Sequence, residues 1–152
     1  CYMGHALMEN KNGLLVDVRL TTACGTAERD TAIEMLDEAL PGSRRITVAA
    51  DRAYDTHDFV RRCRDLNISP HVAQNTRRKG GSAIDGRTTR HSGYRQSLKF
   101  RKRIEEFFGW MKTVGGLRKS RLIGRAKTAF LTTMTGAAYN LLRVARLEAA
   151  SR

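Results

Sequence analysis

Glu105 lies between two cations at spacings that could place a metal ligand beside phosphate-binding groups. Residues 99–112 (KFRKRIEEFFGWMK) predict a helix, because apolar side chains recur at helical spacing. The apolar stripe consists of Phe100, Ile104, Phe107, Phe108 and Met111. Arg101, Glu105 and Lys112 share a second stripe, whereas Glu106 projects away into solvent. A carboxylate near cations suits metal-assisted chemistry on phosphates, but the spacing alone favours an ordinary amphipathic helix with an internal ion pair.

Asp51 is the second candidate ligand, because it ends a short apolar run. Residues 45–51 (RITVAAD) predict a strand buried on both faces. A helix over 56–66 and a strand over 68–73 complete a strand–helix–strand unit with parallel strands. Sites in open α/β sheets gather at the carboxyl ends of strands. The alternative, a helix-capping role, is better suited to Asp55, which leaves Asp51 without a structural role.

The remaining elements are predicted to form a scaffold. Residues 2–9 and 14–20 predict a β-hairpin, because the intervening Asn-Lys-Asn-Gly sequence favours a turn. Thr26 is expected to cap a helix that runs to about Leu40, where Pro41 and Gly42 end it.

The final helix is predicted over residues 126–147 and is expected to pack on the sheet. Its expected buried face consists of Phe130, Met134, Ala137, Leu141 and Val144. The chain has no internal repeat and no low-complexity linker, so residues 1–152 are interpreted as one domain.

The net charge of +13 is unevenly distributed. Residues 1–75 contain nine Lys and Arg against eleven Asp and Glu, whereas residues 76–152 contain nineteen against four. This asymmetry indicates a polyanionic partner, most commonly nucleic acid. Residues 75–97 are expected to form a long basic loop, which either follows a nucleic-acid backbone or is a solvated insertion. An anionic membrane surface is the alternative partner, but the chain has no obvious amphipathic segment that would anchor it there.

The three cysteines share no metal-type spacing, which is typical of reduced thiols in a cytosolic protein.

In order, these elements predict an α/β fold: a ribonuclease-H-like mixed sheet flanked by helices, without its first strand. The chain resembles bacterial insertion-sequence transposases of the DDE class with a Tyr-x2-Arg-x3-Glu-x6-Lys signature. Arg101, Glu105 and Lys112 match this spacing, while Leu98 stands at the tyrosine position and puts that tyrosine's role in doubt. The stretches DRAYDTHDFV, PHVAQNT, SAIDGRTTRHSGY and RIEEFFGWMKTVGGLRKSR extend the resemblance over nearly the whole chain.

The resemblance implies DNA cleavage and strand transfer with two Mg²⁺ ions, for which Mn²⁺ can substitute. Asp51 would be the second carboxylate of the family's triad and Glu105 the third. The resemblance implies that the first carboxylate sits on the family's first strand, which is expected upstream of Cys1. Asp17, toward a sheet edge, is not expected to replace it, so the chain is expected to be incomplete and inactive alone. The expected DNA-binding residues are Arg77, Arg78, Lys79, Arg87, Arg90, Arg101, Lys102, Lys112, Arg118 and Lys119.

The same resemblance implies a homodimer that acts on transposon ends and target DNA, located in the bacterial cytoplasm with the nucleoid and not in a membrane. Two alternatives remain open. One is a non-catalytic DNA-binding remnant, which would show steep salt dependence and gain nothing from Mg²⁺. The other is a metal-dependent nuclease of the same fold, since fold alone does not determine function.

Overall fold

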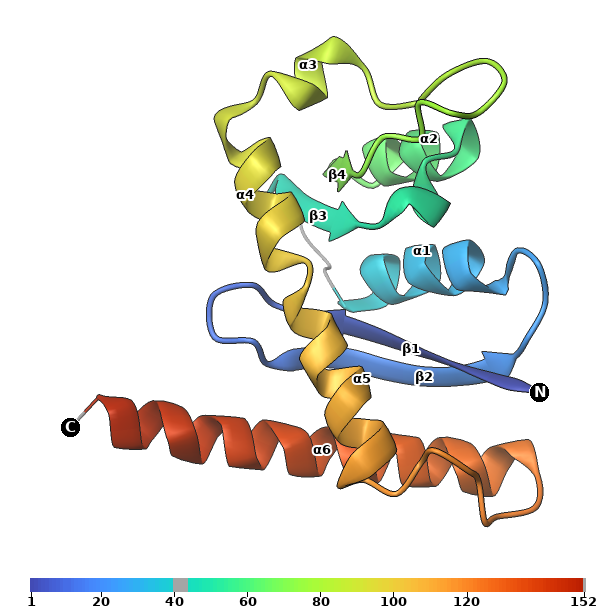
Figure 1. Ribbon diagram of the computed structural model, residues 1–152, viewed down its shortest axis with the longest axis vertical. Coiled ribbons are helices and arrows are strands. Elements are labelled where there is room, and N and C mark those ends of the chain that lie inside the picture. Colours follow the sequence, from blue (N-terminus) through green and yellow to red (C-terminus); the bar gives the residue numbers. More distant parts are fainter. Residues whose placement is uncertain (40–43, 152) are drawn as a thin grey trace. The chain divides into compact units, whose positions relative to one another are not determined.

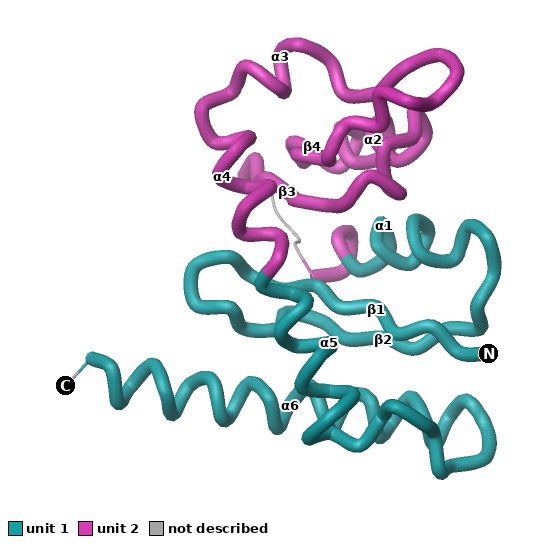
Figure 2. Tube along the Cα trace, viewed as in Figure 1, with its two compact units in different colours: residues 1–35, 103–152 teal, residues 36–102 magenta. Residues whose placement is uncertain are grey.

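The computed structural model describes residues 1–39 and 44–151, which form helices and two small β-sheets (Figure 1). The chain divides into two compact units (Figure 2). Unit 1 contains residues 1–35 and 103–152, and unit 2 contains residues 36–102. Helix α1 (Ala27–Ala39) crosses this division of the chain, and the expected helix end at Leu40 to Gly42 lies outside the described residues.

Unit 1 is built around the predicted hairpin, in which β1 (Tyr2–Met8) pairs antiparallel with β2 (Leu15–Thr22). Glu9 organises the turn, because its carboxylate accepts the backbone N–H groups of Lys11 and Asn12 at 2.7 Å each. Gly13 has a φ of +73°, which a glycine adopts without strain. The hairpin is confirmed.

Helix α6 (Arg125–Ala150) packs against β2, but through a different face from the one predicted. Phe130 is 68% exposed, Leu141 is 73% exposed and Met134 is 51% exposed, so the expected apolar face was wrong. The buried face consists of Thr128, Thr132, Thr135 and Gly136. Each threonine hydroxyl donates to the carbonyl four residues earlier, so its methyl group can be buried without an unpaired donor.

Two close interactions fix α6 on the hairpin. A Cβ at Gly136 would lie 3.1 Å from Val18 Cγ2, so glycine permits this helix to approach closely. The Asn140 amide accepts the Leu15 N–H at 2.8 Å and donates to the Leu15 carbonyl at 2.9 Å. The side chain of Asn140 therefore pairs with β2 much as a neighbouring strand would.

The predicted helix over 99–112 is two helices, α4 (Ser92–Phe100) and α5 (Arg103–Thr113), separated by a turn at 101–102. The two helices contribute to different cores, which accounts for the break. Tyr94 of α4 is buried in unit 2, while Phe107 and Met111 of α5 form a core with Leu15 in unit 1. Arg101 and Glu105 therefore do not share one continuous helix.

Unit 2 contains the predicted strand–helix–strand unit. Strand β3 (Ile46–Ala50) pairs in parallel with β4 (Ile68–Val72), and α2 (His57–Asp65) connects them. Helix α2 buries Phe59, Val60 and Cys63.

Asp55 does not cap α2 as expected. Thr56 is the N-cap, since its hydroxyl oxygen accepts the Phe59 N–H at 3.2 Å. Asp55 is 1% exposed, and its carboxylate accepts the N–H groups of Asn75 at 2.6 Å and Ala83 at 2.8 Å. It anchors the segment that follows β4.

The expected basic loop over 75–97 is irregular only to residue 85. It continues as α3 (Gly86–Thr89) and then as α4. Asp85 and His91 cap these helices by accepting the N–H groups of Thr88 and Gly93. The prediction missed these helices because side-chain caps, rather than apolar periodicity, begin them.

The α/β class with helices flanking small sheets is confirmed and is consistent with a ribonuclease-H-like transposase domain. Among the described residues, the strands form one antiparallel pair and one parallel pair instead of one mixed sheet. The single-domain interpretation stays a prediction. In the described part of the chain, no helix is long and apolar enough to cross a membrane.

Candidate active site and nucleic-acid interface

Asp51 lies directly after β3, as predicted, and is half-buried. The expectation that it has no structural role was wrong, because Asp51 caps the short 3-10 helix η1 (Arg52–Tyr54). Its Oδ1 accepts the Ala53 N–H at 2.8 Å. Its Oδ2 accepts no hydrogen bond from the described residues, so this oxygen is available to a cation.

Glu105 lies in the first turn of α5, where the positive end of the helix dipole favours a carboxylate. Both Glu105 and Glu106 are exposed, so burial does not distinguish them. Glu105 is therefore more exposed to solvent than its position beside the apolar stripe predicted. Its selection rests on the spacing to Arg101 and Lys112.

The two candidate carboxylates belong to different units, Asp51 to unit 2 and Glu105 to unit 1. Within the described residues, no group of three His, Cys, Asp or Glu side chains could hold a metal ion. The donor chemistry of the two carboxylates nevertheless suits Mg²⁺, which prefers oxygen ligands and needs few carboxylates when phosphate oxygens also bind.

The predicted DNA-binding residues are mostly on the surface. Nine are exposed, and Arg101 is half-buried. Arg78 is held in place, because it donates to the Asp55 carbonyl at 2.9 Å. The buried Nε of Arg101 has no hydrogen-bond partner in the part of the chain that the structure describes. A buried guanidinium donor of this kind favours an anionic or water ligand.

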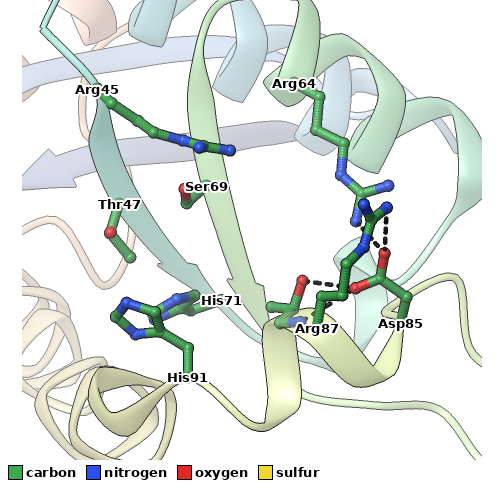
Figure 3. Close-up of a pocket in the computed structure, with 9 residues that line it drawn as sticks. Arg45, Thr47, Arg64, Ser69, His71, Asp85, Arg87 and His91 are labelled. Atoms are coloured by element: carbon green, nitrogen blue, oxygen red, sulfur yellow. Dashed lines mark hydrogen bonds and ion pairs between the residues drawn. The ribbon is translucent and has the colours of Figure 1, made fainter.

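A pocket in unit 2 was not predicted from the sequence (Figure 3). It has a volume of about 590 Å³, and its lining residues define the unit 2 pocket: Arg45, Thr47, Arg64, Ser69, His71, Asp85, Arg87, Thr88 and His91. The alternation of side chains along the two strands could have indicated part of this lining, because Thr47 pairs with Ser69 on the sheet face that also carries His71. The contributions of α2, α3 and α4 depend on the tertiary fold.

Asp85 organises one side of the unit 2 pocket. Its Oδ2 lies 3.0 Å from Arg64 Nη2 and 3.3 Å from Arg87 Nη2. Its Oδ1 accepts both the N–H and the hydroxyl of Thr88 at 3.0 Å. The hydrogen bond from the Thr88 backbone, together with the nearby Arg64 charge, holds the pKa of Asp85 well below its usual range.

Two histidines form another side of the pocket, with ring centroids 5.4 Å apart. His71 is in β4, as predicted, and its Nδ1 is hydrogen bonded to Ser97 Oγ at 2.8 Å. Burial lowers the pKa of His71, and the neighbouring His91 lowers it further. His71 is therefore neutral near pH 7.

An α/β chain with a strongly basic second half has the charge distribution expected of a nucleic-acid-binding protein. Residues 1–141 match the family model described as Transposase DDE domain, and the chain belongs to this family. No curated protein and no solved structure matches the chain. This match confirms the resemblance to DDE transposases. DDE transposases act on DNA and generally use divalent metal ions. The Tyr-Arg-Glu signature group stays a prediction.

Proposed function

We propose that this chain contributes Asp51 and Glu105 to DNA strand cleavage and strand transfer during transposition of an insertion sequence. The family match over residues 1–141 is the observation that carries this proposal. The position of Asp51 after β3, the spacing around Glu105 and the basic second half of the chain support it.

Asp51 and Glu105 would each supply carboxylate oxygens to divalent cations, Mg²⁺ or Mn²⁺. When bound, two such ions activate water or a 3′-hydroxyl and stabilise the leaving oxygen of an in-line displacement. The capping bond from Ala53 N–H orients the Asp51 carboxylate and leaves Oδ2 for the ion. Glu105, in the first turn of α5, is exposed and therefore accessible to an incoming ion and DNA.

DNA phosphates would contact the exposed basic residues, above all Lys112 and the half-buried Arg101 with its unpartnered Nε. The acting form would be a homodimer associated with the bacterial nucleoid.

We also propose that residues 1–152 alone supply only two of three catalytic carboxylates and do not catalyse transposition. The absence of a three-residue metal cluster from the described residues favours this, and also favours the second candidate, a non-catalytic DNA-binding protein.

Metal binding separates these two candidates. In amide NMR spectra of the purified chain, Mn²⁺ is expected to broaden signals near Asp51 and Glu105, and Asp51→Asn is expected to remove the broadening around residue 51. Asp58→Asn is the matched control, because Asp58 is exposed and paired with Arg61 in the same unit. Equal broadening around Asp51 and the control Asp58, or an undiminished signal loss around residue 51 in Asp51→Asn, would contradict the metal role.

Plasmid nicking tests the proposed incompleteness. The chain is expected to nick supercoiled DNA in Mg²⁺ no faster than its Asp51→Asn variant. Mg²⁺-dependent nicking that Asp51→Asn abolishes would show that 1–152 has a complete site.

A further inference from the structure

We propose that the unit 2 pocket binds a phosphate ester, the group that free nucleotides and DNA strands share. The pocket includes neither Asp51 nor Glu105 and shares only Arg87 with the expected DNA-binding residues, so it is a binding site beyond the proposed metal site. If the bound ester belongs to a DNA strand, this inference rests on the proposed function. If it belongs to a free nucleotide, the inference does not depend on the proposed function.

The charge of the pocket favours an anion. Three arginines against one aspartate leave a formal net charge of +2, with the histidines not counted. Asp85 does not oppose an anion effectively, because Arg64, Arg87 and Thr88 already occupy its oxygens. A guanidinium has five N–H donors, so Arg64 and Arg87 retain donors for a second acceptor. Asp85 thus positions two cations at the rim.

The other side of the pocket carries groups that the protein does not use. Among the described residues, the Arg45 guanidinium and the hydroxyls of Thr47 and Ser69 have no hydrogen-bond partner. The His91 ring uses Nδ1 to cap α4, and its Nε2 has no hydrogen-bond partner in the part of the chain that the structure describes. Guanidinium, hydroxyl and imidazole groups that converge on one space are the groups that bind phosphate oxygens.

The size of the pocket favours an ester over a bare phosphate. Its volume of about 590 Å³ is within the range of small-molecule sites and exceeds what one phosphate fills. The rings of His71 and His91, whose planes are tilted by 52°, both line the pocket and offer ring surface to the organic part of the ligand (Figure 3).

Binding of three probes tests the proposal: inorganic phosphate, adenosine monophosphate and a short single-stranded DNA, each measured by calorimetry at fixed salt. Arg45→Gln is expected to weaken binding of at least one ester about tenfold, which corresponds to about 1.4 kcal/mol. Arg45 is exposed and pairs with none of the described residues, so the variant should fold. Arg95→Gln is the matched control, because Arg95 is an exposed residue of unit 2 that does not line the pocket. Thr47→Glu, which adds a negative charge at an exposed lining position, is expected to weaken ester binding more than tenfold.

The two sources of the ester give different results. A loss confined to adenosine monophosphate identifies a nucleotide site, and a loss confined to DNA identifies a strand contact. Equal effects of Arg45→Gln and Arg95→Gln, or no binding of either ester by the unmodified chain, would overturn the proposal. Mn²⁺ broadening around residue 51 tests the metal role and calorimetry of Arg45→Gln tests the pocket, so failure of the metal role and failure of the pocket are distinguishable.

Discussion

The two units differ in the sequence separation of the residues that their polar side chains join by hydrogen bonds. In unit 1, Asn140 bonds to Leu15, 125 residues away, and Arg143 Nε donates to the Asn12 carbonyl at 2.7 Å, 131 residues away. In unit 2, Asp55 bonds to Asn75 and Ala83, which are 20 and 28 residues away. Loop-closure entropy grows with separation, so unit 2 is organised by closer contacts while unit 1 depends on bringing α6 back to the hairpin.

The largest expected effect is at Asp55. Asp55→Ala leaves the Asn75 and Ala83 N–H groups without their acceptor and is expected to lower the free energy of unfolding by about 3 kcal/mol. Urea unfolding measures this, and amide exchange should accelerate first in unit 2. Asp58→Ala is the control, with an expected change within about 0.5 kcal/mol, because its ion pairs are exposed. Equal losses in the two variants would refute the anchoring role.

A smaller effect is expected at Asn140 in unit 1. Asn140→Ala removes both hydrogen bonds to Leu15 and should cost about 2 kcal/mol. Faster amide exchange in β2 is the diagnostic observation. Arg146→Ala, an exposed change on the same helix, should leave exchange in β2 unaltered. Unchanged exchange in Asn140→Ala would mean that apolar packing alone holds α6 on the hairpin.

The smallest effect distinguishes the two faces of α6. Thr132 is 2% exposed and Phe130 is 68% exposed. Thr132→Ala is expected to cost about 1 kcal/mol through its buried methyl group, whereas Phe130→Ala should change stability by less than about 0.5 kcal/mol. Thermal or urea unfolding of both variants provides the comparison. A larger loss for Phe130→Ala would restore the apolar face predicted from the sequence.

Local patterns predicted the hairpin, the strand–helix–strand unit and the position of Asp51, because each depends on neighbouring residues. The buried face of α6 could not be predicted from apolar periodicity. Its threonines satisfy their hydroxyls within the helix, and Gly136 makes room for Val18.

The candidate site was predicted less completely than the fold. The strand end at Asp51 was recognised, but its capping bond to Ala53 was not, because a three-residue 3-10 helix has no apolar periodicity. The unit 2 pocket draws Arg45, Arg64 and Asp85 from separate elements, so only the tertiary fold brings them together.

Alkylation of the buried Cys63 thiol in α2 can be used to measure the opening of unit 2. Its side chain is fully buried, and burial raises the pKa of its thiol to about 12, so an alkylating reagent finds almost no thiolate there in the folded chain. Cys1 and Cys24, both exposed, belong to unit 1. The rate at which Cys63 becomes alkylated therefore reports any unfolding that opens unit 2, with the exposed thiols of Cys1 and Cys24 in unit 1 as the internal reference.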